Sequence, residues 1–246
     1  MAVPPLPNEM YAYILNFIDD DVELLNICNG NPKLCNDNFI LNRLRNKYGI
    51  TKEEADKYSV TPGSFWRSPV KISYLEYYTN LVKRIQAAEK NYFSLMEYAI
   101  DSGRTDLAKI AIKLDPYVVD HENIKRVMRS RDPTYAILIL FLDYQKNNRK
   151  TLHLFINELL MDAIQYHAVG AVKILLDYGA SASMMGNTPI RIAVASGNIP
   201  MTKVLLDKGA SVRDARNSLA SASWLNSKVQ AELRELFQHF PSEGNK

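Results

Sequence analysis

The residue types that most often carry out catalysis or hold metals are few and scattered in this chain. Its four histidines, His121, His153, His167 and His239, include no pair at the spacing of metal ligands. His121 precedes Glu122, but the second histidine that a zinc-protease helix places one turn later is absent. The glycines stand singly, so no glycine-rich phosphate loop is formed. We therefore expect no catalytic residues, no metal site and no cofactor.

The two cysteines, Cys28 and Cys35, are surrounded by apolar residues. No apolar run approaches the ~18 residues needed to cross a bilayer, and the first residues lack the basic region and apolar stretch of a signal peptide. We therefore expect an intracellular protein, cytoplasmic or nuclear, whose thiols are reduced and partly buried. A disulfide between the two cysteines is the alternative.

Two clusters of cations could bind phosphate groups. One comprises Lys125, Arg126, Arg129 and Arg131, and the other spans Lys146–Lys150. A nucleic-acid site would need both clusters on one face, with aromatic side chains between them. The net charge of +3 on 246 residues is too small to indicate nucleic acid by itself. We expect these cations to lie on solvated edges, and we do not expect nucleic acid or a membrane as a partner.

The elements that must position these residues repeat along the chain. Leu175–Ala182 reads Leu-Leu-Asp-Tyr-Gly-Ala-Ser-Ala and returns almost unchanged at Leu205–Val212, a period of 205 − 175 = 30 residues. A period between about 20 and 50 residues is typical of stacked helical units, none of which can bury its apolar face alone. The sequence therefore predicts an all-α helical solenoid whose function lies along its surface.

In the clearest repeat each signature residue has a physical reason. Thr188 can cap a helix, and Pro189 suits the first turn, where its missing N–H is not needed. Ala193 must be small because the two helices of the unit approach closely there. Gly197 stands where the helix ends in a left-handed residue, which glycine adopts without a steric penalty. His167 replaces the aligned glycine in the preceding unit, so that turn is either strained or differently shaped.

These residues resemble the ankyrin repeat, with about four to five degenerate repeats over residues 91–240. The apolar residues that anchor the second helices are Ile112, Leu142, Leu176 and Leu206. The last repeat is expected to be short, with a first helix near Leu219–Trp224 and a second helix over Lys228–Phe237. Ankyrin proteins bind other proteins and do not catalyse, so the resemblance implies a protein target on the concave side of the stack.

The finger before the clearest repeat carries two adjacent methionines, Met184 and Met185. It is shorter than the usual ankyrin finger. Two adaptable apolar side chains there would either be covered by a partner or fold onto the stack, and the sequence leaves both open. The positions that correspond to the target-binding surface of ankyrin proteins are Asp101, Ser102, Gln165, Tyr166, Met184, Met185, Asn187, Ala195 and Ser196.

Residues 1–49 are predicted to form a separate module of three short helices. Leu6-Pro7 with a nearby glutamate, an apolar helix, and an aspartate followed by Leu24-Leu25 resemble an F-box. The resemblance implies that a Skp-type subunit of a cullin-RING ubiquitin ligase binds this module. The residues expected to contact that subunit are Leu6, Pro7, Ile14, Leu15, Leu24 and Leu25. Packing of these helices against the connector around Phe65 and Trp66 is the alternative.

Residues 50–90 are expected to connect the two modules. They include a capping helix over residues 72–82, and residues 241–246 are expected to form a disordered tail. The side chains that this helix should bury are Leu75, Tyr78, Leu81 and Val82. An F-box-like module followed by degenerate ankyrin units is similar to proteins of large DNA viruses, which implies a location in an infected host cell.

The sequence favours a non-catalytic protein–protein interaction adaptor. By resemblance, it would be a substrate receptor that links a target to a Skp-cullin-F-box type ubiquitin ligase. One alternative is an ankyrin scaffold or inhibitor of a host or viral partner, with the N-terminal helices as a structural cap. Another is a nucleic-acid-associated factor. Because repeat folds are shared by unrelated functions, the sequence does not identify the target.

Overall fold

The computed structural model describes residue 15 and residues 18–61, 70–88, 91–130, 135–149 and 152–240. The chain divides into two compact units, Met1–Val118 and Val119–Lys246. Each unit is helical, as predicted. The domain boundaries expected at residues 49, 90 and 240 stay predictions, and the expected disordered tail lies outside the described residues.

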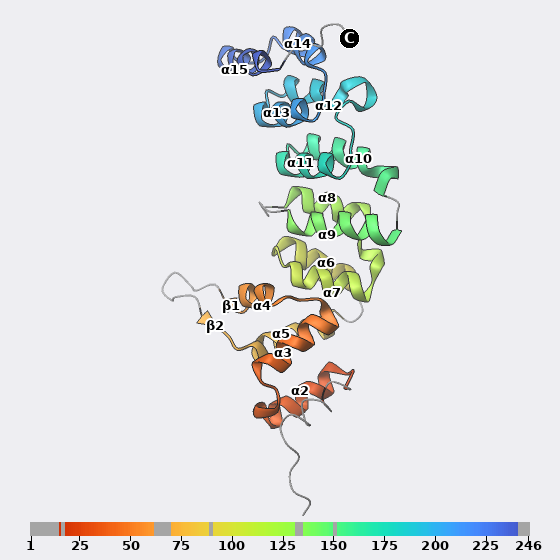
Figure 1. Ribbon diagram of the computed structural model, residues 1–246, viewed down its shortest axis with the longest axis vertical. Coiled ribbons are helices and arrows are strands. Elements are labelled where there is room, and N and C mark those ends of the chain that lie inside the picture. Colours follow the sequence, from red (N-terminus) through yellow and green to blue (C-terminus); the bar gives the residue numbers. More distant parts are fainter. Residues whose placement is uncertain are drawn as a thin grey trace, which may run out of the picture. The chain divides into compact units, whose positions relative to one another are not determined.

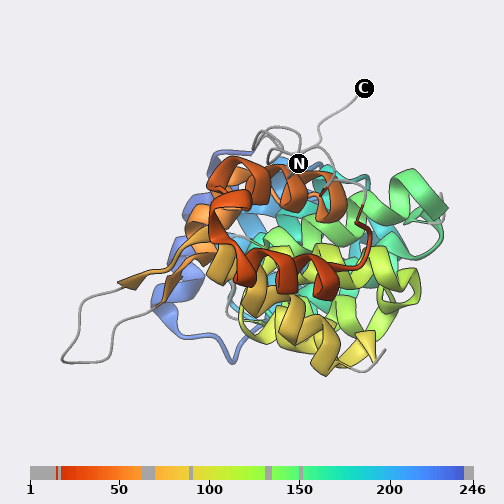
Figure 2. The ribbon, with the colours of Figure 1, turned by 90° about the horizontal axis from the view of Figure 1, so that it is seen from below.

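The first unit is built of short helices (Figure 1). Those of its N-terminal part are α2 (Asp21–Gly30), the 3-10 turn η1 (Pro32–Leu34), α3 (Asp37–Arg43), the π-helical turn η2 (Leu44–Tyr48) and α4 (Lys52–Tyr58). Those that follow are α5 (Tyr74–Ala87), α6 (Tyr92–Asp101), α7 (Thr105–Leu114) and the 3-10 turn η3 (Pro116–Val118). Two strands, β1 (Val60–Thr61) and β2 (Val70–Lys71), pair antiparallel with Val60 opposite Lys71. They extend away from the helices of this unit (Figure 2).

Helix α5 is the centre of the first unit, because it contacts α2, α3 and α4. It begins after Ser73, whose hydroxyl caps it by accepting a bond from the Glu76 N–H at 3.1 Å. The predicted burial is confirmed for Tyr78, Leu81 and Val82. Leu75 is only half-buried, because it lies in the first turn at the end of the buried stripe, and Tyr77 is buried instead.

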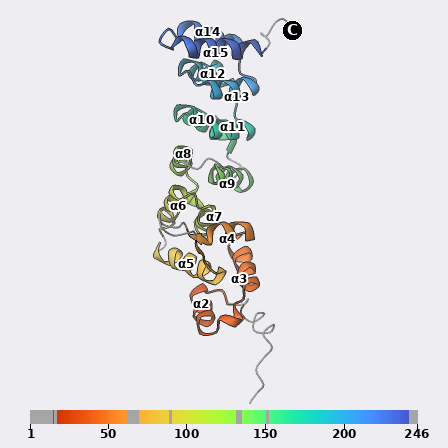
Figure 3. The ribbon, with the colours of Figure 1, turned by 90° about the vertical axis from the view of Figure 1, so that its left-hand side faces the viewer.

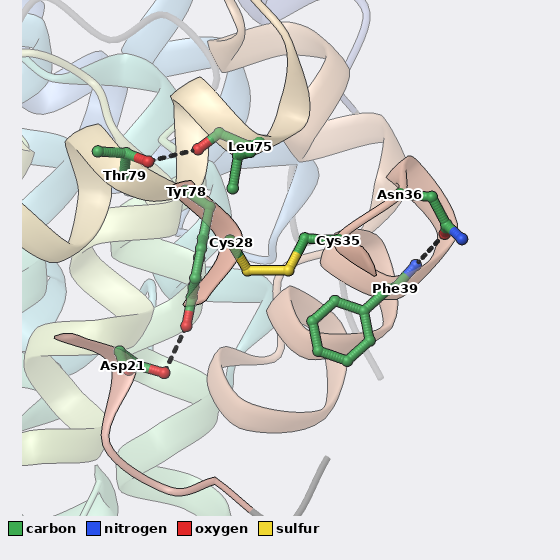
Figure 4. Close-up of a disulfide and its surroundings, with 8 residues drawn as sticks. All are labelled: Asp21, Cys28, Cys35, Asn36, Phe39, Leu75, Tyr78 and Thr79. Atoms are coloured by element: carbon green, nitrogen blue, oxygen red, sulfur yellow. Dashed lines mark hydrogen bonds between the residues drawn. A yellow bond between two sulfur atoms is a disulfide. The ribbon is translucent and has the colours of Figure 1, made fainter. Parts of the chain in front are cut away.

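Cys28 and Cys35 form a disulfide (Figure 4). The prediction of reduced thiols is therefore wrong. Cys28 lies in the last turn of α2, and η1 turns the chain back so that Cys35 stands just before α3 with its Cα 5.5 Å from that of Cys28. Both side chains are buried, at 0% and 4% exposure. The tight return between two helices brings the sulfurs together, and the spacing alone does not show it.

The second unit is a stack of helix pairs. Its helices are α8 (His121–Arg129), α9 (Ala136–Tyr144) with the π-helical turn η4 (Gln145–Arg149), α10 (Leu152–Gln165), α11 (Val169–Asp177), α12 (Met184–Ala195), α13 (Ile199–Asp207), α14 (Val212–Ser221) and α15 (Ser227–Gln238). In Figure 3 the first helices α8, α10 and α12 form one column, and the second helices α9, α11 and α13 form another. Ala193 is fully buried, as its small size predicts.

Equivalent hydrogen bonds recur one repeat apart in this unit, with the same period as the sequence. Asn157 Oδ1 accepts a bond from the Ser181 N–H at 2.8 Å, and Asn187 Oδ1 accepts one from the Ser211 N–H at 3.3 Å. Asn157 lies within α10 and Asn187 in the turn at the start of α12, and in both cases the serine precedes the first helix of the next repeat. Each repeat therefore fixes the backbone of its successor.

The last repeat differs from the prediction. Its first helix, α14, begins at Val212, so the expected helix near Leu219–Trp224 is wrong. Ser211 caps α14, and only three of its residues are buried (Val212, Ala215 and Leu219), which makes its apolar stripe thin. The second helix, α15, is confirmed, with Leu233 and Phe237 buried.

The turn after α10 is strained at His167. Its φ is 55°, close to the 66° of Gly197 at the same place one repeat later. The hydrogen bonds also match, since Ala168 N–H donates to the Ala163 carbonyl at 2.9 Å and Asn198 N–H donates to that of Ala193 at 3.0 Å. Of the two predicted possibilities, the strained turn is therefore the correct one.

Replacing His167 by glycine should stabilise the protein by about 1 kcal/mol. A side chain with a Cβ costs roughly 1–2 kcal/mol in the left-handed region, and the greater freedom of glycine in the unfolded chain offsets part of that gain. Urea unfolding of the variant measures the difference. His153→Gly is the control, because it makes the same change at a helical position and should destabilise the protein. A loss of stability in His167→Gly would show that the turn at His167 is not strained.

Candidate functional site

A groove in the second unit lies between α12 and α14, the first helices of its last two repeats. Its volume is about 540 Å³, within the roughly 300–1,000 Å³ of ligand pockets. The residues that line it, all exposed or half-buried, are Thr188, Arg191, Ile192, Ala195, Asp214, Asn217, Ser218 and Ser221. Of the predicted target-binding residues, only Ala195 is among them. The lining offers both charges, several hydrogen-bonding groups and two apolar side chains.

Hydrogen bonds between the last two repeats hold the groove open. Ser218 Oγ donates to the Arg191 carbonyl at 3.0 Å, and Asn187 Nδ2 donates to Asp214 Oδ2 at 2.9 Å. Because these bonds join α12 to α14 directly, the groove is preformed, and a partner would lose little free energy in ordering it.

Trp224 stands beside the groove, in the turn between α14 and α15. Its indole N–H donates to the Ala195 carbonyl at 2.9 Å while 68% of the residue is exposed. The bond fixes the orientation of the ring and leaves most of its apolar surface open. Tryptophan is the residue type most enriched among the anchors of protein interfaces.

The first turn of α12 is irregular, with three consecutive residues of positive φ, Met185, Gly186 and Asn187, at 46°, 63° and 61°. Thr188 does not cap the helix as predicted: its hydroxyl donates to the Met185 carbonyl at 2.7 Å. The turn leaves Met185 73% exposed, whereas Met184 is half-buried. Met185 is therefore open to a partner, whereas Met184 folds partly onto the stack.

The other predicted target-binding residues lie at helix ends. Gln165 and Ser196 are exposed, and Tyr166 is half-buried beneath the Arg129 guanidinium, 5.2 Å from the ring centroid. Asp101 and Ser102 are exposed at the end of α6, in the first unit. The predicted set is thus divided between the two units, and its role in binding stays a prediction.

The groove residues that sequence reasoning missed belong mainly to α14. Asp214, Asn217 and Ser218 went unrecognised because the first helix of the last repeat was expected further along the chain. A start signal was present: Ser211 Oγ accepts a bond from the Asp214 N–H at 3.2 Å, and serine is a preferred N-cap.

The residues predicted to bind a Skp-type subunit fall into two groups. Leu6, Pro7 and Ile14 lie outside the described residues. Leu15, Leu24 and Leu25 are buried, at 4%, 0% and 7% exposure. The contact of all six residues with a partner stays a prediction. Leu15, Leu24 and Leu25 are packed within the first unit.

Asp21 is the most heavily bonded side chain of the N-terminal module, and it is 9% exposed. Its Oδ1 accepts from Arg43 Nη2 at 2.8 Å, and its Oδ2 lies 2.8 Å from Lys47 Nζ. The hydroxyls of Tyr48 and Tyr78 also donate to it; Figure 4 shows the bond from Tyr78. One carboxylate therefore joins α2, α3, η2 and α5.

The balance of these contacts favours the charged form of Asp21. Burial alone would raise the pKa of its carboxyl, but the hydrogen bonds from Lys47, Tyr48, Tyr78 and Arg43 outweigh burial and lower it. Conversely, burial and the bond to Asp21 raise the pKa of both tyrosines. Asp21 therefore stays ionised at neutral pH while both tyrosines stay protonated, and the cluster acts as a structural link.

Three of the cations that could bind phosphate groups, Lys125, Arg129 and Lys146, are engaged with protein groups. Lys125 Nζ lies 3.6 Å from Asp162 Oδ2, and Lys146 Nζ lies 5.8 Å from the ring centroid of Tyr178. The Tyr178 hydroxyl donates to Asp143 at 2.6 Å, and burial together with this bond raises the pKa of Tyr178 to about 12. Arg131 and Lys150 lie outside the described residues.

Chemistry-bearing side chains remain dispersed in the folded protein. His121 Nε2 lies 3.4 Å from Asp162 Oδ2. In the part of the chain that the structure describes, no three His, Cys, Asp or Glu residues converge as a metal site would require. Nor does any helix in the described ranges combine the length and apolar character of a membrane span.

One of the comparisons with known proteins agrees with the stack of helix pairs. No curated protein and no solved structure matches the chain. Residues 126–216 match the family model of ankyrin repeats (3 copies), from α8 into α14. The fold is an all-α ankyrin-type solenoid, and ankyrin repeats are a protein–protein interaction module.

Proposed function

We propose that this protein is an adaptor that holds a protein target in the groove between α12 and α14 and does no chemistry of its own. The observation that carries the proposal is the preformed groove with Trp224 fixed beside it. A rigid surface with both charges, hydrogen-bonding groups and an exposed aromatic anchor suits a folded or extended protein segment. Met185, also exposed, would extend this surface toward the finger.

The finer proposal is that the protein is a substrate receptor of a Skp-cullin-F-box type ubiquitin ligase. It is supported by the resemblance of the N-terminal residues to an F-box. With two binding surfaces on one chain, the target's effective concentration near the ligase rises, which sets specificity without catalytic residues. This role belongs in the cytoplasm or nucleus, and in an infected host cell if the likeness to viral proteins holds.

A second candidate is a scaffold or inhibitor whose N-terminal helices only complete the fold. Leu24 and Leu25 favour it, because both are buried and α2 packs against α5. Side chains that already form a core are unavailable to a partner unless the module rearranges.

Affinity capture with two variants separates these functions. Changing Leu6 and Pro7 together to alanine should release a Skp-type subunit and leave a groove-bound target attached, because apolar interface anchors contribute about 2 kcal/mol or more each. Ala195→Trp, which fills the groove, should do the reverse. Mass spectrometry of the captured proteins measures both losses.

Each candidate function makes a different prediction for this experiment. If no Skp-type subunit binds the unmodified protein, the ligase proposal fails and the scaffold takes its place. If the Leu6 and Pro7 variant unfolds, those residues belong to the core. If a target binds the Ala195→Trp variant as tightly as it binds the wild type, the groove is not its binding site.

A further inference from the structure

A second concave site lies within the first unit, between α4, α5 and α7. Its volume is about 510 Å³, also within the roughly 300–1,000 Å³ of ligand pockets. The floor is apolar. Leu81 and Leu107 are buried at its base, and Ile72 is half-buried beside them. An apolar side chain of a ligand would find contacts here that water does not satisfy.

The rim of this pocket is cationic. Lys83, Arg84 and Arg104 line it, and no acidic residue does so among the described residues. Arg104 is paired with Asp106, which is 0% exposed and also accepts a bond from the Tyr77 hydroxyl at 2.6 Å. Lys83 and Arg84, both exposed, have no ion-pair partner in the described ranges. Two positive charges with no ion-pair partner among the described residues thus stand over an apolar floor.

The aromatic rings near the pocket orient its cations. The Arg84 guanidinium lies 4.0 Å from the ring centroid of Tyr98, and the Arg104 guanidinium lies 4.6 Å from that of Tyr58. Lys57 Nζ also lies over the Tyr58 ring, at 4.9 Å. Cation–π contact restricts the long side chain of Arg84 and leaves its N–H groups to donate, whereas those of Arg104 already donate to Asp106.

These contacts also decide the chemical class of the ligand. Single-stranded nucleic acid binds where bases can stack on open aromatic faces. Here the ring of Tyr77 is buried, and cations already lie over the rings of Tyr58 and Tyr98. An apolar floor with a positive rim instead matches an apolar side chain flanked by carboxylates.

We propose that this pocket binds an acidic segment of a partner protein. One apolar side chain of that segment enters between Leu81 and Leu107, and carboxylates on either side of it pair with Lys83 and Arg84. The site lies entirely within the first unit and does not depend on the groove between α12 and α14. Charge complementarity carries the choice of partner.

The test measures the binding of short labelled peptides to the full-length protein by fluorescence anisotropy. The probe is Glu-Glu-Leu-Glu-Glu, with Gln-Gln-Leu-Gln-Gln and Glu-Glu-Gly-Glu-Glu as comparisons. The acidic peptide with leucine should bind at least about tenfold more tightly than either, because it alone satisfies both the rim and the floor.

Three variants locate the binding. Changing Lys83 and Arg84 together to glutamine should weaken it about tenfold, since both ion pairs are lost. Asn80→Trp changes no charge but fills the pocket from an exposed position of α5, and it should weaken binding as well. The matched control changes the exposed Lys33 and Lys52 to glutamine, which alters the net charge equally and should leave the affinity within twofold.

Several results would overturn the proposal. One is equal binding of the acidic and neutral peptides, and another is an equal loss in the control variant. A third is competition by a single-stranded oligonucleotide of the same charge. If it displaces the labelled peptide more effectively than the unlabelled peptide does, the pocket binds nucleic acid instead. Circular dichroism melting of each variant verifies that a lost affinity is not a lost fold.

Discussion

Replacing Asp21 by alanine should lower the free energy of unfolding of the first unit by about 3–5 kcal/mol. The change leaves Arg43, which is 7% exposed, without its counter-charge, and it removes the acceptor for two buried tyrosine hydroxyls. Losing one partner of a buried pair is far more costly than losing a surface pair, because the remaining charge stays desolvated. Hydrogen exchange across α2, α3 and α5 measures the effect where it occurs.

Asp19 provides the matched control for this experiment. It is exposed, and its carbonyl, not its carboxylate, accepts hydrogen bonds from Arg43 and Lys47. Asp19→Ala removes the same charge two positions away and should change stability by no more than about 0.5 kcal/mol. Equal effects of the two substitutions would show that the Asp21 cluster does not stabilise the unit.

Acid should remove the same stabilisation. Because hydrogen bonds lower the pKa of Asp21 in the folded state, its contribution is complete above the ordinary carboxyl range, about pH 4, and is lost as the pH falls through the folded pKa. The stability difference between the wild type and Asp21→Asn should therefore narrow below about pH 4. A difference that stays constant down to pH 2 would refute this linkage.

Reducing the disulfide between Cys28 and Cys35 should destabilise the first unit by roughly 2–3 kcal/mol. The bond closes a loop with a sequence separation of 7, which restricts the unfolded chain by about that amount. Urea unfolding with and without dithiothreitol measures the difference. The double variant Cys28→Ala, Cys35→Ala is the matched control, since its midpoint should not respond to the reductant. Two titratable thiols in the untreated native protein would contradict the bond.

The helix pairs of the second unit could be predicted from the sequence because their signals are local and recur. The octapeptide that begins at Leu175 and the turn at Gly197 each mark the end of a helix within a few residues. Helix α14 was misplaced because it buries only three side chains and is otherwise mostly polar, so few apolar residues mark it in the sequence. The groove was missed for the same reason, since half of its lining belongs to that helix.

The N-terminal module was harder to predict because long-range contacts decide it. The four groups that donate to Asp21 lie between 22 and 57 residues further along the chain. Their side chains come together only once α5 packs against α2, and no local sequence pattern predicts these contacts. The disulfide also depends on the tertiary turn between two helices. Spacing and composition favoured free thiols, and the packing decided otherwise.

The bonds that the backbone N–H groups of Ser181 and Ser211 donate to Asn157 and Asn187 run in one direction along the chain. In each pair the acceptor is made before the donor during synthesis. As the chain leaves the ribosome, the repeats that contain Asn157 and Asn187 therefore each present a formed acceptor onto which the next repeat docks, and this part of the second unit assembles vectorially.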